Sequence, residues 1–257
     1  MASVVRLTPR RNLSSAPFNL REFRLKFRAF AAGAAACALL ALTGCATKPQ
    51  LAVSLNRATL STQGTRVGVA MTPLPKIDTS FPGANCLLCI ATASVANSSL
   101  TAHTKTLNHE DLPKLKQAVA DLIRKRGVEP VILADDVKLD AYPDRAVSAD
   151  GNFARKDYSA LLKKHGIDKL LLIDIREIGF ERTYSSYVPT SDPKAVLRGS
   201  ASLIDLKTHT LDWYQPLAIM RASDGVWDEP PKFPGLSNAY FQVIELTKDE
   251  VLKPLQP

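Results

Sequence analysis

The pair Cys86-Leu87-Leu88-Cys89 holds the residues of this chain best suited to covalent chemistry. Two cysteines spaced in this way at a helix start can form a thiol-disulfide centre, because the helix end lowers the pKa of a thiol. Exchange of the thioredoxin type also needs a strand directly before the motif. Residues 78–85 are polar and contain a proline, which predicts a loop. We therefore expect a structural disulfide between Cys86 and Cys89, and keep a thiol-disulfide redox-active envelope protein as the alternative.

Other residue types that catalyse reactions are scattered along the sequence. No Gly-x-Ser-x-Gly, P-loop, Gly-x-Gly-x-x-Gly or His-Glu-x-x-His pattern occurs. One C-x-x-C motif supplies only two of the four ligands of a structural zinc site. The four histidines stand apart from it and from one another, at His103, His109, His165 and His209. The sequence therefore predicts no enzyme, no metal site and no cofactor.

The segment before Cys45 has the organisation of an export signal. Seven Lys or Arg residues and one Glu fall within residues 1–28, and an uninterrupted apolar run fills residues 29–42. A basic region, a short apolar region and small residues at the cleavage site define a secretory signal peptide. The apolar run is shorter than the roughly 20 residues of a membrane-spanning helix. Residues 1–44 are therefore predicted to be removed.

Leu42-Thr43-Gly44-Cys45 resembles the lipobox of bacterial lipoproteins. The resemblance implies cleavage before Cys45, a diacylglycerol on its sulfur and a further fatty acid such as palmitate on the new amino terminus. Several acyl chains give a stable membrane anchor. Ala46, in place of an Asp, implies the outer membrane, with the protein facing the periplasm. Removal of the signal also lowers the net charge from +8 to +2, so the basic precursor gives no reason to expect a nucleic-acid partner.

The mature chain is predicted to be one α/β domain behind a short tether. Residues 45–64 are polar and irregular, as in a tether, and residues 65–257 suffice for a periplasmic domain with its own core. Helical periodicity predicts helices at 86–100, 112–126, 156–164 and 236–252. Apolar runs predict strands at 66–71, 128–133 and 170–175. A helix followed by a buried strand occurs twice, which indicates parallel β-α-β crossovers. Apolar and polar residues alternate over 197–203 and 211–219, which predicts a C-terminal antiparallel hairpin. We expect a single domain with a mixed sheet and flanking helices.

This order of elements resembles that of envelope lipoproteins whose domain is like the amino-terminal domain of TolB, including the curli secretion-channel lipoprotein. The likeness is carried by Val67-Gly68-Val69-Ala70, by residues 161–173, and by a hairpin with Asp205 and Trp213. It implies a non-enzymatic protein-binding or assembly role in the envelope and transfers no functional residue. A channel would need long amphipathic hairpins, and residues 181–194 are too few and too polar for one.

Two loops carry aromatic residues that are candidates for contact with an envelope protein partner. Tyr184 and Tyr187 lie in residues 183–189, and Trp227 and Phe233 lie in residues 225–234. Tyrosine and tryptophan are enriched in binding hot spots. The alternative is that these rings pack on the domain's own core, where aromatic burial contributes strongly.

Overall fold

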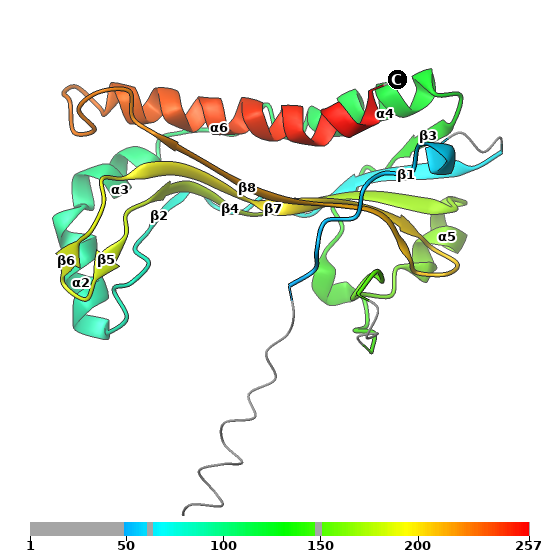
Figure 1. The fold of residues 1–257 in the computed structure, drawn as a ribbon, viewed down its shortest axis with the longest axis horizontal. Coiled ribbons are helices and arrows are strands. Elements are labelled where there is room, and N and C mark those ends of the chain that lie inside the picture. The colour runs from blue at the N-terminus through cyan, green and yellow to red at the C-terminus, as the bar shows by residue number, and fades with distance from the viewer. Residues whose placement is uncertain (1–48, 61–63, 147–150, 257) are drawn as a thin grey trace, which may run out of the picture. The chain divides into compact units, whose positions relative to one another are not determined.

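The computed structural model describes residues 49–60, 64–146 and 151–256. The predicted signal peptide, residues 1–44, and the predicted lipid site, Cys45, lie outside the described residues. Gln50–Pro257 form one compact unit. Figure 1 shows its helices arranged around a long twisted sheet.

The sheet is mixed, as predicted. Its strand order is β3-β1-β4-β7-β8. The strands are β1 (Arg66–Met71), β3 (Glu129–Ile132), β4 (Lys169–Glu181), β7 (Lys194–Asp205) and β8 (Leu211–Ala222). Strand β1 runs parallel to β3 and β4, whereas β4, β7 and β8 form an antiparallel meander. The predicted α/β class, crossovers and hairpin are confirmed.

Strand β4 is about twice as long as the apolar run that predicts it. Its first five residues pair with β1, and its last three pair with β2 (Asp78–Ser80), which follows β1 along the same side. A Cβ atom at Gly179 would collide with the carbonyl of Asp78, so this close pairing requires a glycine. The prediction that residues 78–85 form a loop is therefore wrong for the first three of them.

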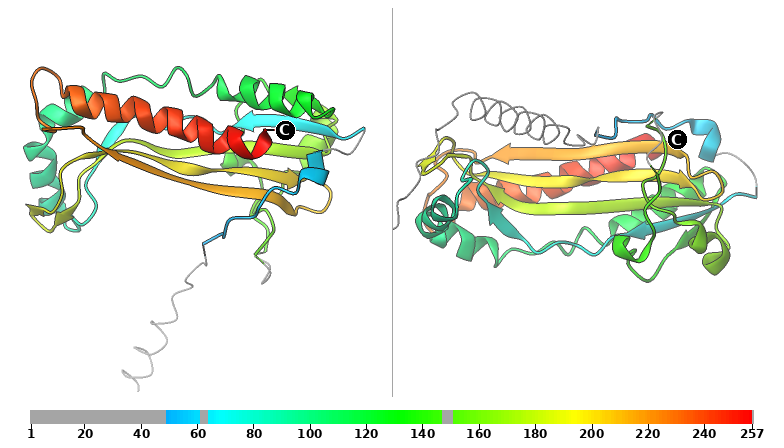
Figure 2. Two further views of the ribbon diagram at one scale, coloured as in Figure 1. Left: turned by 45° about the horizontal axis from the view of Figure 1, so that its top comes forward. Right: turned by 90° about the horizontal axis from the view of Figure 1, so that it is seen from below.

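Helices cover both faces of the sheet. Helices α4 (Leu115–Lys125) and α6 (Pro234–Leu252) pack on one face, and α5 (Ser159–His165) lies on the other (Figures 1 and 2). The α4 face buries its apolar positions in the main core with the inward residues of β4, β7 and β8. Short 3-10 turns occur at Arg57–Leu60, Leu139–Ala141 and Lys253–Leu255.

The single helix expected at 86–100 is two helices, α2 (Leu87–Ala96) and α3 (Ser98–Thr104). The break falls at the buried residue Asn97. Its amide nitrogen donates to the carbonyl of Ala93 at 2.7 Å and to the hydroxyl of Tyr184 at 2.6 Å, and its oxygen accepts from Arg182 at 3.0 Å. These tertiary hydrogen bonds hold Asn97 outside helical geometry.

Part of the expected tether packs on the domain. Val53 exchanges two backbone hydrogen bonds with Tyr214 of β8, at 2.8 and 2.9 Å. Leu60 is fully buried in the main core. The packed unit therefore begins near Gln50, which shortens the expected tether.

Candidate functional site

One end of the sheet carries a lobe without charged residues. We define the α2 lobe as residues 79–104, with α2, α3 and the last two residues of β2, together with residues 183–191, with β5 (Tyr184–Ser185) and β6 (Val188–Pro189). Neither segment contains a Lys, Arg, Asp or Glu. At the 23% charged content of the whole chain, a stretch of this size would hold about eight. Figures 1 and 2 show the two segments side by side.

The α2 lobe exposes large apolar side chains to an unusual degree. Six of the eleven exposed large hydrophobic residues of the described chain lie on it. Their exposed fractions are 88% for Leu87, 70% for Leu88, 47% for Ile90, 76% for Val95, 50% for Tyr187 and 63% for Val188. Contiguous exposed apolar surface marks an interaction site more often than single exposed residues do.

A small separate core holds the lobe together. It contains Ala84, Cys89, Ala93 and Tyr184, with Phe81 packed against it. The rings of Phe81 and Tyr184 meet edge to face, with centroids 5.9 Å apart. Tyr184, a predicted contact residue, is 6% exposed. Its ring therefore packs the lobe, whereas Tyr187, three residues later, faces solvent.

The disulfide between Cys86 and Cys89 caps the start of α2. Their Cα atoms are 4.9 Å apart, and their sulfur atoms lie at disulfide distance. The backbone N–H of Cys89 donates to Sγ of Cys86 at 3.0 Å, so Cys86 is the N-cap of the helix. The hydroxyl of Tyr187 lies 3.6 Å from the same sulfur and is the donor, since a disulfide sulfur carries no proton. This contact of the Tyr187 hydroxyl links the start of α2 to the β5–β6 hairpin.

The predicted contact residues Trp227 and Phe233 lie together at the start of α6. Their rings stack with centroids 6.1 Å apart, and both are partly buried against the main core. The guanidinium of Arg182 lies 4.8 Å from the centre of the Trp227 ring, a cation–π contact. The Phe233 ring also packs on His103, and burial together with the nearby Lys232 lowers the pKa of that histidine. The two rings are thus largely used within the fold.

Strand β8 offers an open edge of the sheet. Tyr214 bonds to Val53 on the side away from β7, so residues 216, 218, 220 and 222 point their backbone groups to that same side. Pro216 has no N–H. Within the described chain, the N–H groups of Ala218, Met220 and Ala222 have no partner. Three donors at alternate positions are what an added strand needs.

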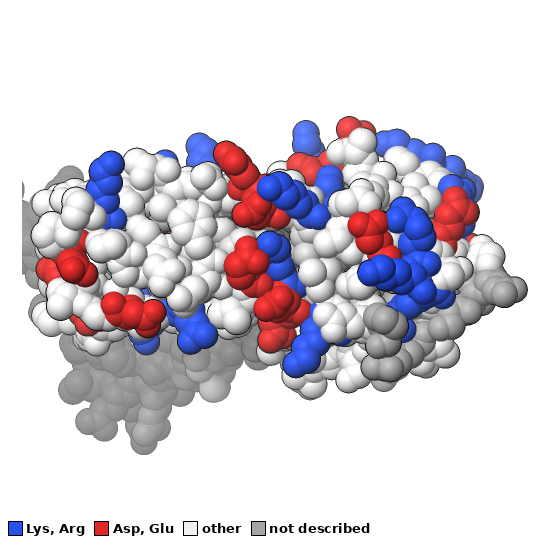
Figure 3. All heavy atoms as spheres, turned by 90° about the horizontal axis from the view of Figure 1, so that it is seen from above, with Lys and Arg blue, Asp and Glu red and all other residues white. Residues whose placement is uncertain are grey.

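The opposite end of the sheet is closed by ion pairs. Lys169 donates to Asp205 at 2.9 Å and to Asp212 at 2.6 Å. Burial raises the pKa of Asp205, but hydrogen bonds from the Thr208 backbone, Lys169 and the Lys207 backbone outweigh it and lower the pKa to about 2. On the α6 side, Figure 3 shows cationic and anionic side chains interspersed, with no field of one sign. That mixture is unlike the footprint of a nucleic-acid-binding face.

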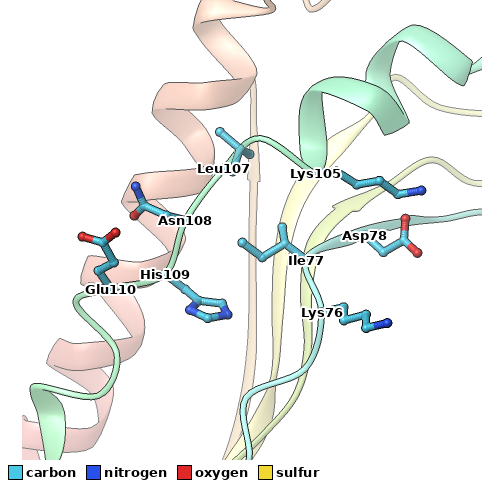
Figure 4. A pocket seen from close by; sticks show the side chains of 8 residues that line it. All are labelled: Lys76, Ile77, Asp78, Lys105, Leu107, Asn108, His109 and Glu110. Carbon is cyan, nitrogen blue, oxygen red and sulfur yellow. The ribbon is translucent and has the colours of Figure 1, made fainter.

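A hollow of about 670 Å³ lies between residues 76–78 and 105–110. Its walls mix Lys76 and Lys105 with Asp78 and Glu110, and their polar ends do not converge on one point (Figure 4). Among residues 49–60, 64–146 and 151–256, no group of three His, Cys, Asp or Glu residues is placed to hold a metal ion. No helix within those ranges is long and apolar enough to cross a membrane.

Neither a protein-family model nor a curated protein matches the chain. Among solved structures, protein XCC0632 from Xanthomonas campestris has a TM-score of 0.36 at 14% identity, covering 80% of this chain and 93% of that one. The PelC dodecamer from Paraburkholderia phytofirmans has a TM-score of 0.31 at 13% identity, and the match covers 80% of this chain and 96% of that one. Lipoprotein GNA1162 from Neisseria meningitidis has a TM-score of 0.26 at 14% identity, and the match covers 71% of this chain and 96% of that one. These TM-scores are too low to support an inference about this chain, and the resemblance to the TolB and curli group stays a prediction.

Proposed function

We propose that this protein is a lipid-anchored outer-membrane lipoprotein that faces the periplasm and binds a protein partner without catalysis. Cys45 carries the anchor in this proposal. The α/β unit is the binding module, and an extended segment of the partner adds to the edge of β8.

The observation that supports the proposal is the open stretch of β8 from Ala218 to Ala222. The chain already uses this edge once, where Val53 pairs with Tyr214. Beyond Pro216, Ala218 and Met220 combine an exposed side chain with a backbone N–H group that has no partner in the described chain. Strand addition gains affinity from such backbone hydrogen bonds and specificity from alternate side chains.

A proline at position 218 tests the proposal. Ala218→Pro removes an N–H that points away from β7, so the β7–β8 ladder keeps its hydrogen bonds. Ala218→Val keeps the N–H and enlarges the side chain, which makes it the matched control. We expect cross-linking in intact cells, followed by purification from the solubilised envelope, to recover a defined partner with the wild type and with Ala218→Val.

Ala218→Pro is expected to lower that recovery about tenfold or more, the loss of one to two hydrogen bonds at a buried interface. Circular dichroism and the urea midpoint verify that the variant folds. Recovery of no partner by any variant would contradict the binding role. Equal recovery with Ala218→Pro would contradict the β8 edge as its site.

A redox role for Cys86 and Cys89 is the second candidate. Cys86 is exposed and Cys89 is 3% exposed, so one sulfur of the bond is open to attack by an external thiolate. Five residues separate the end of β2 from Cys86, which differs from the thioredoxin arrangement. The double change Cys86→Ser and Cys89→Ser tests this role. It should abolish function with the fold intact if the pair is redox-active, and leave partner recovery unchanged if the pair is structural.

A further inference from the structure

We propose that the α2 lobe inserts its apolar tip into the lipid bilayer that holds the anchor. The inserted side chains are those of Leu87, Leu88, Ile90 and Val95, with Tyr187 and Val188 beside them. This inference rests on the proposed anchoring at Cys45 and adds a second point of attachment to the membrane. It is independent of the protein-binding edge on β8.

The chemistry of helix α2 points to an apolar medium. A helix that is apolar around its whole circumference is normally buried in a core or in a membrane. Helix α2 reads LLCIATASVA, and only Cys89 and Ala93 are buried by the rest of the domain. The large side chains of the other faces project outward in the described structure. Something outside this unit must therefore cover the helix.

The absence of charge selects lipid over a protein surface. Charged side chains are costly inside a bilayer, and the whole lobe, residues 79–104 and 183–191, has none. Protein interfaces instead surround an apolar centre with a polar rim, and Arg is enriched in them. Tyr187, in the turn between β5 and β6, is a residue type enriched where lipid headgroups meet water.

The position of the tether brings a bilayer within reach. Four residues separate Cys45 from Gln50, and five extended steps of at most about 3.5 Å each span roughly 18 Å. The packed unit begins at Gln50. In Figure 1 the first described segment, drawn in blue, and the α2 lobe both extend to the side of the sheet away from α6. The tether is therefore short enough for a membrane attached through Cys45 to reach the lobe.

Bilayer insertion is measured by fluorescence quenching in lipid vesicles. The full lipidated protein, with Leu88→Trp, is reconstituted into phosphatidylethanolamine and phosphatidylglycerol vesicles whose acyl chains carry bromine. Bromine quenches an indole that enters the acyl-chain region. Val226→Trp is the matched control, because Val226 is 66% exposed on the separate loop 223–233. The native Trp213 and Trp227 contribute the same background to both variants.

We expect brominated lipid to lower the added emission of Leu88→Trp at least twofold and to leave that of Val226→Trp unchanged. Adding Leu87→Asp to Leu88→Trp should abolish the quenching, because an aspartate is expelled from the acyl region. Equal emission of Leu88→Trp in brominated and ordinary lipid would overturn the proposal. If the indole of Leu88→Trp is protected from aqueous acrylamide in native envelopes but not in pure lipid vesicles, the proposal is overturned and a protein partner covers the lobe.

The mass of the reconstituted protein separates this inference from the proposed function. Absence of quenching in a sample whose Cys45 carries its acyl chains refutes insertion alone. A sample without acylation at Cys45 refutes the anchor.

Discussion

The two ends of one sheet treat their apolar residues in opposite ways. At the α5 end, Leu161, Leu170 and Ile204 are buried and ion pairs of Lys169 close the surface. At the other end, the α2 lobe leaves six large apolar side chains in contact with solvent. Burial of apolar surface stabilises a fold, so the α5 end contributes to folding. The exposed residues of the lobe contribute little to the stability of the isolated unit, which indicates that they serve a contact with a membrane or another molecule.

The largest contrast is expected between matched leucine truncations at the two ends. Leu170→Ala removes a fully buried side chain and should lower the free energy of unfolding by about 2–5 kcal/mol. Leu88→Ala removes a 70% exposed one and should change it by less than about 0.5 kcal/mol. Urea titration measures both. Similar losses for the two variants would show that Leu88 is packed in the folded protein.

A glycine substitution tests how tightly the lobe is packed. Gly83 has φ of 89°, and a Cβ atom there would collide with the carbonyl of Tyr184. Gly83→Ala should destabilise the lobe by about 2–4 kcal/mol, through left-handed strain and overpacking together. Hydrogen exchange of α2 amides reports this local loss. The control is Gly127→Ala, with φ of 80° and open space around it, which should cost only about 1–2 kcal/mol.

The disulfide should stabilise the lobe and leave the α5 end unaffected. Replacing Cys86 and Cys89 by serine releases a loop of four residues, for which the chain-entropy estimate is about 2 kcal/mol. Hydrogen exchange in α2 should therefore speed up, while amides of β4 and α5 keep their protection. An equal loss of protection in β4 would mean that the lobe and the rest of the sheet unfold as one unit.

Acid should affect the α5 end first. The folded-state pKa of Asp205 is about 2, below its ordinary value of 3.8, so its carboxylate stabilises the fold above about pH 4. That contribution fades as the pH falls from about 4 to 2, and we expect about 1 kcal/mol after solvent screening. Asp205→Asn should remove this part of the acid sensitivity in urea titrations at pH 5.5 and 3. An unchanged pH dependence would assign the effect to other carboxyl groups.

The sequence predicts the elements whose signal is local. The apolar face of α4 and the strand Arg66–Met71 follow directly from periodicity. The break at Asn97 does not, because it depends on Tyr184 and Arg182, more than 80 residues away. Strand β2 has three residues and exists only through its pairing with β4.

The candidate site was only partly visible in the sequence. The sequence singles out both Tyr184 and Tyr187 as contact candidates; in the structure Tyr187 is exposed, whereas Tyr184 packs inside the lobe. The sequence does not predict the exposure of Leu87, Leu88 and Val95, since apolar residues on a predicted helix are normally assigned to the core. The missing signal was the run without charged residues from 79 to 104, which can be read directly from the sequence.

Both the lobe's insertion and the partner-binding role depend on attachment at Cys45. The intact mass of the protein purified from its native membrane tests that attachment directly. We predict the mass of residues 45–257 plus a diacylglyceryl group and one amide-linked fatty acid. A mass that includes residues 1–44, or an unmodified Cys45 at the amino terminus, would contradict the account.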